Sequence, residues 1–283
     1  MSSSSQVKRP ISGVGIGLRS QHIQEILTAL PNTLPNIGWL ELLADNHLAE
    51  GGLDVAQLEA IAEHYPLTLH CVGMSLASVE PLDLDYCQRI KQLAKRVNAT
   101  WVSEHLCFSA ALGLYSHDLL PVPYNQTTLA HCVQRILQIQ EALGERILVE
   151  NVSSYMTFEN SNMSEIEFIN ALAEQADCDL LIDVNNIYVN QLNHGLDSES
   201  YIDQLPLDRV KEIHLAGYQQ QENFVLDAHN NPVSEPVWQL YQRLIKKRPT
   251  IPTLIEWDND IPPLPVLLAE AEKAHQIMQQ AAR

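Results

Sequence analysis

The chain has 283 residues, of which 46% are apolar, and a formal net charge of −18. That length accommodates one large domain, and the apolar fraction is sufficient to build its core. The negative charge repels polyanions, so nucleic acid and anionic membrane surfaces are poor candidate partners. No stretch approaches the ~18 consecutive apolar residues of a membrane span, and the polar start of the chain is unlike a signal peptide.

The cysteines are few, widely spaced and odd in number: Cys71, Cys87, Cys107, Cys132 and Cys178. They form no CxxC pair, which argues against a zinc ribbon or a thioredoxin-type motif. A reducing compartment fits this usage, so we expect a cytoplasmic protein. Buried free cysteines are usually inert in packing, and we leave them out of any metal site.

Short apolar runs alternate with longer amphipathic stretches along the chain. We expect a disordered tail at residues 1–10. Strands are expected at 14–18, 39–43, 67–72, 100–106, 146–152, 180–186, 210–216 and 253–258. Helices are expected at 84–97, 125–144, 164–176 and 237–247, because apolar residues recur there at helical spacing. Gly144 is placed to end the second of these helices.

Eight strand–helix units in a chain of this length predict a single (β/α)₈ TIM barrel of the xylose isomerase-like type over residues 11–283. The alternative is an open, doubly wound sheet, whose site usually lies near two or three strand ends. A barrel can gather side chains from nearly all its strand ends. The distribution of polar residues favours the barrel.

Potential metal ligands stand at the carboxyl ends of six consecutive expected strands. In chain order they are His70, then Glu104 and His105, then Glu150 and Asn151, then Asp183 with Asn185 and Asn186, then His214, then Glu256 and Asp258. Any one histidine at a strand end is more often a hydrogen-bonded structural residue than a ligand. All of them together, converging on one barrel mouth, predict a metal centre.

Three of these residues are carboxylates that follow apolar, strand-forming runs: Glu150, Asp183 and Glu256. Burying unpaired carboxylates is costly, and several together need a counter-charge. Arg146 and Lys211 stand at strand beginnings, and we expect no Arg or Lys at the strand ends. Metal ions are the natural remaining counter-charge, with histidines as neutral nitrogen ligands. The number of ligands suggests at least two metals and a bridging carboxylate.

Two further features are open to more than one interpretation. Asp227 and His229 form a D-x-H pair whose side chains would share one side of an extended segment, or they are ordinary polar residues of a surface loop. Glu41 and Asn46, after the second strand, either line a substrate pocket or cap the next segment.

The sequence resembles two known groups. The ligand order is similar to the trinuclear pattern of endonuclease IV and xylose isomerase-like barrels. The stretches "HCVGMSLAS", "SEHLCF", "ENVSSY", "DVNNIYVNQLNHG", "EIHLAG", "DAH" and "LIEWD" resemble, in this order, the multinuclear non-heme iron-dependent oxidases, a bacterial family that includes the methanobactin-biosynthesis oxidase. This resemblance spans roughly residues 12–260.

The resemblance implies an enzyme with two or three iron ions, in mixed Fe(II)/Fe(III) states, that uses O₂ to modify cysteine residues of a ribosomally made precursor peptide (RiPP biosynthesis). Zinc or manganese are further possible occupants of the purified protein. A companion protein would recruit the peptide in trans.

Carried onto this chain, the resemblance gives His70, His105 and Glu150 to one iron, with Glu150 bridging to a second iron held by Asp183, His214 and Glu256. Asp227, His229 and Asn186 form the third position, where endonuclease-type barrels have His instead of Asn186. Glu150, Asp183 and His214 are the expected catalytic residues. Substrate contacts are expected from Glu41, Asn46, Ser75, Asn151 and His194.

Two rival functions share the same ligand set. The first is a redox-inert metal hydrolase or isomerase acting on phosphate esters or sugars. A phosphate substrate would favour Arg or Lys near the strand ends. The second is a metal-binding protein without catalysis.

Overall fold

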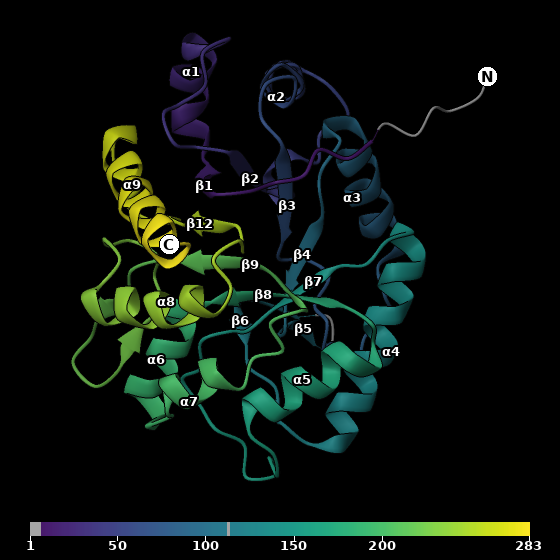
Figure 1. Cartoon of the computed structure of the whole chain (residues 1–283). Coiled ribbons are helices and arrows are strands. Elements are labelled where there is room, and N and C mark those ends of the chain that lie inside the picture. Colours follow the sequence, from purple (N-terminus) through teal and green to yellow (C-terminus); the bar gives the residue numbers. More distant parts are fainter. Residues whose placement is uncertain (1–6, 112–113) are drawn as a thin grey trace.

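Parallel strands of the computed structural model, which describes residues 7–111 and 114–283, close into a barrel in the order β1-β12-β9-β8-β7-β4-β3-β2 (Figure 1). This confirms the predicted (β/α)₈ barrel and excludes the open sheet. The strands are β1 (Val14–Leu18), β2 (Trp39–Leu43), β3 (Leu67–Cys71), β4 (Val102–His105), β7 (Leu148–Glu150), β8 (Asp179–Asp183), β9 (Val210–Leu215) and β12 (Thr253–Ile255).

Helices cover the outside of the barrel (Figure 1). They are α1 (Ser20–Ala29), α2 (Leu53–Ala62), α3 (Leu84–Val97), α4 (Gln126–Leu143), α5 (Glu165–Gln175), α6 (Val184–His194), α7 (Ser198–Asp203), α8 (Glu235–Lys247) and α9 (Leu264–Ala281), with a 3₁₀ turn η1 (Ala44–His47) after β2. No helix within the described ranges is long and apolar enough to cross a membrane.

The four helices expected from apolar spacing are confirmed as α3, α4, α5 and α8, and their ends have local causes. Asp83 caps α3 by accepting a hydrogen bond from the Tyr86 amide. Gly144 ends α4 in a left-handed conformation, as predicted. Ser164 and Glu167 form a capping box at the start of α5.

Two hairpins stand outside the barrel and were not predicted. β5 (Phe108–Ala111) pairs with β6 (Leu114–Leu120), and β10 (Gln219–Gln220) pairs with β11 (Val225–Leu226). The sixth expected strand also ends earlier, because α6 begins at Val184 and Asp183 caps it through the Asn186 amide. Asn185 and Asn186 therefore lie on the first turn of a helix at the barrel mouth.

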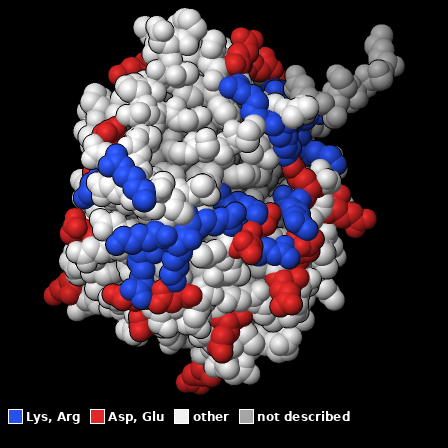
Figure 2. Space-filling model, viewed as in Figure 1, with Lys and Arg blue, Asp and Glu red and all other residues white. Residues whose placement is uncertain are grey.

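Basic residues stand mostly at the other end of the barrel, where the strands begin. Arg146 and Arg209, just before β7 and β9, both pair with Asp177. On the face drawn in Figure 2, Lys and Arg form a band with acidic side chains at its edges. Of the tail expected at 1–10, residues 1–6 lie outside the described part, while Lys8 and Arg9 hydrogen-bond to main-chain oxygens before β4 and β3.

Candidate metal centre

Two histidines and a carboxylate meet at the carboxyl ends of β3, β4 and β7. The Nε2 atoms of His70 and His105 are 3.2 Å apart. Each also lies 3.2 Å from Glu150 Oε2. Ligands bound about 2.1 Å from one metal ion are separated by roughly 3.0–3.4 Å in octahedral or tetrahedral geometry. The three atoms therefore already have the mutual spacing of ligands to a single ion.

The second oxygen of Glu150 belongs to another group. Glu150 Oε1 lies 3.7 Å from His214 Nδ1, and that nitrogen is 2.9 Å from Glu256 Oε2. Together with Asp183, these residues offer ligand atoms that all lie within 4.8 Å of one another. The carboxylate of Glu150 thus stands between two groups of ligands and can contribute one oxygen to each.

A third group forms where the loop after β11 returns to the barrel mouth. His229 Nε2 lies 2.7 Å from Asp227 Oδ1 and 3.7 Å from Asp183 Oδ2. The expectation of an extended D-x-H segment is wrong, because His229 has a left-handed φ of 45°. The amides of Asp258 and Asn259 donate to the His229 carbonyl oxygen at 2.9 and 3.3 Å. These bonds hold the main chain of the strained residue, and its ring nitrogens lie beside Asp227 and Asp258.

Several oxygens of these groups are buried without a hydrogen bond. Glu150 Oε2, Asp183 Oδ2 and Asn186 Oδ1 accept none from the described residues. Orphaned buried oxygens are costly, and a metal ion bound by them would remove that cost. The donor set is imidazole, carboxylate and amide oxygen, which suits iron, manganese or zinc. The residues therefore fit the metal ions that the resemblance implies.

The pKa values of these carboxyl groups also indicate that the site lacks positive charge. Burial raises the pKa of the Glu150 carboxyl well above its ordinary value. Burial also raises the pKa of Asp183 to about 7, although His229 opposes the shift. Burial alone would do the same to Glu256, but His214 and His229 hold its pKa well below the ordinary value. In the metal-free protein, protons therefore compete for positions that cations could take.

Two buried carboxylates hold the inner side of His214. Its Nε2 lies 3.0 Å from Glu41 Oε1 and 3.4 Å from Glu212 Oε1, and Glu41 also accepts a hydrogen bond from Thr68. Glu41, expected near the substrate, lies below the ligands, where it can orient His214. Glu212 was not singled out from the sequence. Its position two residues before His214 on one strand was the available signal, since alternate residues share a face.

The expectation that no basic residue stands at the strand ends is wrong. Arg19 directly follows β1, is buried, and forms an ion pair with Asp258. Its guanidinium also lies 3.7 Å from Glu256 Oε1. Asp258 in turn lies 3.2 Å from His229 Nδ1. Arg19 thus supplies one fixed positive charge to an otherwise acidic barrel mouth and anchors the partner of His229.

The remaining predicted residues occupy different surroundings. Asn46 is exposed on η1, and Ser75 is buried with its hydroxyl accepting from the Ser109 amide. Asn151 is buried and pairs with both main-chain groups of Asp183. Of the five expected substrate contacts, only His194 lines the cavity at the barrel mouth. Glu104 is buried, accepts from the Met74 and His105 amides, and lies 3.3 Å from Nδ1 of His105, where it can orient that ring.

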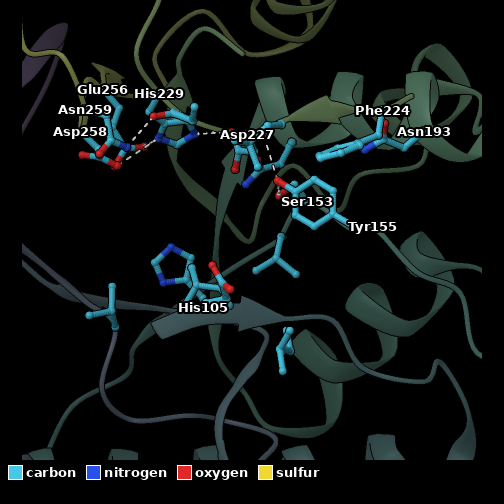
Figure 3. A pocket seen from close by; sticks show the side chains of 18 of the residues that line it. His105, Ser153, Tyr155, Asn193, Phe224, Asp227, His229, Glu256, Asp258 and Asn259 are labelled. Carbon is cyan, nitrogen blue, oxygen red and sulfur yellow. Dashed lines mark hydrogen bonds and ion pairs between the residues drawn. The ribbon is translucent and has the colours of Figure 1, made fainter. Parts of the chain in front are cut away.

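A cavity of about 880 Å³ opens above the ligand groups. His105, Asp227, His229, Glu256 and Asp258 face it from the barrel mouth (Figure 3). Within the part of the chain that is described, its lining includes no Lys or Arg. All five cysteines are buried and free, and the described chain places none in a candidate ligand group.

Comparison with known proteins shows the family to which the chain belongs. The model of the family described as "RiPP precursor modification enzyme MbnB/TglH/ChrH" matches residues 13–279. The chain belongs to the MbnB/TglH/ChrH family. A UPF0276 protein of Acaryochloris marina is 50% identical over 93% of this chain and 94% of that protein. A second UPF0276 protein, from an Anaeromyxobacter species, is 41% identical over 95% and 94% of the two chains.

Solved structures similar to this member of the MbnB/TglH/ChrH family share its fold. An L-ribulose 3-epimerase superposes with a TM-score of 0.61 at 11% identity, covering 97% of this chain and 96% of that one. A xylose isomerase-like TIM barrel protein from Mycobacterium smegmatis, solved with magnesium, has a TM-score of 0.55 at 14% identity and covers 83% and 81%. At such identities the likeness concerns the barrel alone.

Proposed function

We propose that the protein is a multinuclear iron-dependent oxidase that uses O₂ to modify cysteine residues of a ribosomally synthesised precursor peptide. The observation that carries the proposal is the placement of Glu150 in a chain of the MbnB/TglH/ChrH family: its Oε2 faces His70 and His105, and its Oε1 faces His214. One carboxylate shared by two ligand groups suits a centre of neighbouring metal ions better than one isolated ion.

In this proposal the described side chains divide into three positions. His70, His105 and Glu150 hold the first iron. Glu150, Asp183, His214 and Glu256 hold the second. Asp227, His229 and Asn186 form the third. Iron bound there would supply one-electron redox chemistry and reactivity toward O₂, which imidazole and carboxylate ligands support.

The chain's own groups then keep the centre in place. Glu41 and Glu212 fix the ring of His214, and Asp258, held by Arg19, faces Nδ1 of His229. Leu43, Val72 and Val152 line the cavity beside the ligands and exclude water from part of its wall. The peptide enters this cavity, and a companion protein recruits it in trans. The five free, buried cysteines agree with a reducing, cytoplasmic setting.

The alternative is a redox-inert metal hydrolase or isomerase on the same barrel. Phosphate esters are poorly matched to a cavity whose described lining is acidic and without Lys or Arg. Sugars remain a possible class of substrate for the alternative function. The likeness to L-ribulose 3-epimerase does not decide this, because it concerns the fold alone.

Oxygen uptake separates the two functions. The protein is purified anaerobically, its metals are measured, and O₂ consumption is followed with a cysteine peptide and with its serine counterpart. We expect the protein to contain iron. We expect it to consume O₂ with the cysteine peptide but not with the serine peptide. Full occupancy by zinc, with no iron and no peptide-dependent uptake, would contradict the proposal.

A further inference from the structure

Three apolar side chains form one wall of the cavity at its opening. Tyr155, Leu192 and Phe224 line it, and their exposed fractions are 43%, 43% and 45%. They come from the loop after β7, from α6 and from the β10–β11 hairpin. We name these three residues the apolar rim. Partly exposed aromatic and aliphatic side chains that line a cavity are typical of surfaces that bind a ligand.

The apolar rim is held in place by polar contacts on its outer side. Asn193 donates to the Val225 carbonyl at 3.0 Å and accepts from the Val225 amide at 2.8 Å, which joins α6 to the hairpin. The rings of Tyr155 and Phe224 meet edge to face at 5.8 Å. Figure 3 shows both beside Asn193 at the cavity. A fixed wall loses little conformational freedom when a ligand covers it.

The apolar rim is also adjacent to the ligand groups. The Tyr155 hydroxyl accepts a hydrogen bond from the Asp227 amide at 2.9 Å, and Asp227 Oδ1 is 2.7 Å from His229 Nε2. A side chain bound at the apolar rim would therefore lie beside Asp227 and His229. The cavity volume of about 880 Å³ falls in the range of roughly 300–1,000 Å³ that holds drug-sized ligands, which leaves room for neighbours of a cysteine.

Leu192 and Phe224 leave apolar surface exposed to water at the cavity opening. An apolar side chain of the ligand would remove this surface from water.

We propose that the apolar rim is the subsite for an apolar side chain adjacent to the cysteine of the substrate peptide. This inference rests on the proposed function. The proposed function names cysteine as the modified residue, and the inference adds a preference for the residue beside that cysteine.

Peptide binding tests the subsite directly. Capped peptides Gly-Xaa-Cys-Xaa-Gly, with Leu, Ala or Asp at Xaa, are titrated up to millimolar concentration into the anaerobic, metal-loaded protein by calorimetry. We expect the Leu peptide to bind about tenfold more tightly than the Ala peptide, since it buries additional apolar surface, and also more tightly than the Asp peptide, whose side chain is charged. Equal binding of the Leu and Ala peptides would overturn the subsite and leave the peptide substrate standing. Binding of none of the three peptides would also overturn the subsite, while the proposed function is tested separately by O₂ uptake.

Matched variants locate the effect. Leu192→Ser and Phe224→Ser should each abolish most of the preference for Leu over Ala, with metal content unchanged. Leu137→Ser is the control, because this leucine also lies within a helix, is 47% exposed and does not line the cavity. If Leu137→Ser reduced the preference as much as Leu192→Ser, or if neither rim variant reduced it, the apolar rim would not be the subsite.

Discussion

Glu150 presents its two oxygens to different groups of side chains, and its place between His105 and His214 follows from the order β4-β7-β8-β9 in the barrel. Strand ends that neighbour one another in space bring their side chains to one point. A single residue can therefore belong to two ligand groups without any long loop. This makes the carboxylate of Glu150 the residue whose removal is most informative.

Glu150→Ala should lose two metal ions together, because each group gives up a ligand from the same side chain. Elemental analysis of the anaerobically prepared variant measures this. Glu165→Ala is the matched control, since Glu165 is also a buried carboxylate but pairs with Tyr201 and Asn190, outside the candidate groups. Loss of one ion only in Glu150→Ala would argue against a bridge.

Arg19 is the buried cation that sequence inspection missed. Arg19→Gln removes the guanidinium that pairs with Asp258, whose side chain is 36% exposed, and that lies 3.7 Å from Oε1 of the buried Glu256. Losing one member of a buried pair typically costs a few kcal/mol, and the exposure of Asp258 lowers that cost. We expect unfolding in urea to show a loss of about 1–3 kcal/mol. Arg146→Gln, in the solvent-exposed pair with Asp177, should change the stability far less. Equal effects of the two substitutions would refute the buried role.

At the scale of elements, the β10–β11 hairpin and the loop after it carry Asp227 and His229 back over the barrel. Gly217, just after β9, makes this return possible. A Cβ at Gly217 would lie 2.1 Å from the Asn231 carbonyl oxygen and 2.5 Å from that of Pro232. The main chain at 231–232 therefore packs directly on residue 217, and only glycine permits that approach.

Gly217→Ala should push the returning loop outward and remove the third metal position before the other two. We expect one metal ion fewer per chain and a stability loss of about 1–3 kcal/mol, as for other overpacked sites. Gly51→Ala is the control, because a Cβ there meets nothing within 4 Å and its φ is not positive. Unchanged metal content in Gly217→Ala would contradict this role of the loop.

At the scale of the whole molecule, the candidate centre contains more acidic groups than the protein itself neutralises. Burial raises the pKa of Asp183 to about 7 in the absence of metal. Metal ions bind the ionised carboxylate, so binding below that pH must release a proton. We expect iron(II) affinity to keep rising above pH 7 toward about pH 9, because burial lowers the pKa of the ligand His105 but Glu150 and Glu104 raise it to about 9. Below these pKa values the affinity should fall by roughly tenfold per pH unit for each proton released. Chelator competition under anaerobic conditions measures this, and an affinity independent of pH would contradict it.

The sequence predicted the barrel because its signals are local. Alternating apolar runs and helix ends such as Gly144 act within a few residues, and parallel strands then bring His70, His105, Glu150 and His214 together. The contacts that the sequence did not predict join residues that are far apart along the chain. Arg19 meets Asp258 only because β1 closes against β12, and the left-handed turn at His229 depends on main-chain bonds from 258 and 259.

Anomalous diffraction at the iron and zinc absorption edges, on crystals of the anaerobically prepared protein, would identify and locate the metal ions. We expect iron at two positions, one beside His70, His105 and Glu150 Oε2, the other beside Glu150 Oε1, His214 and Glu256. Zinc alone at both positions, or no metal within bonding distance of Glu150, would contradict it.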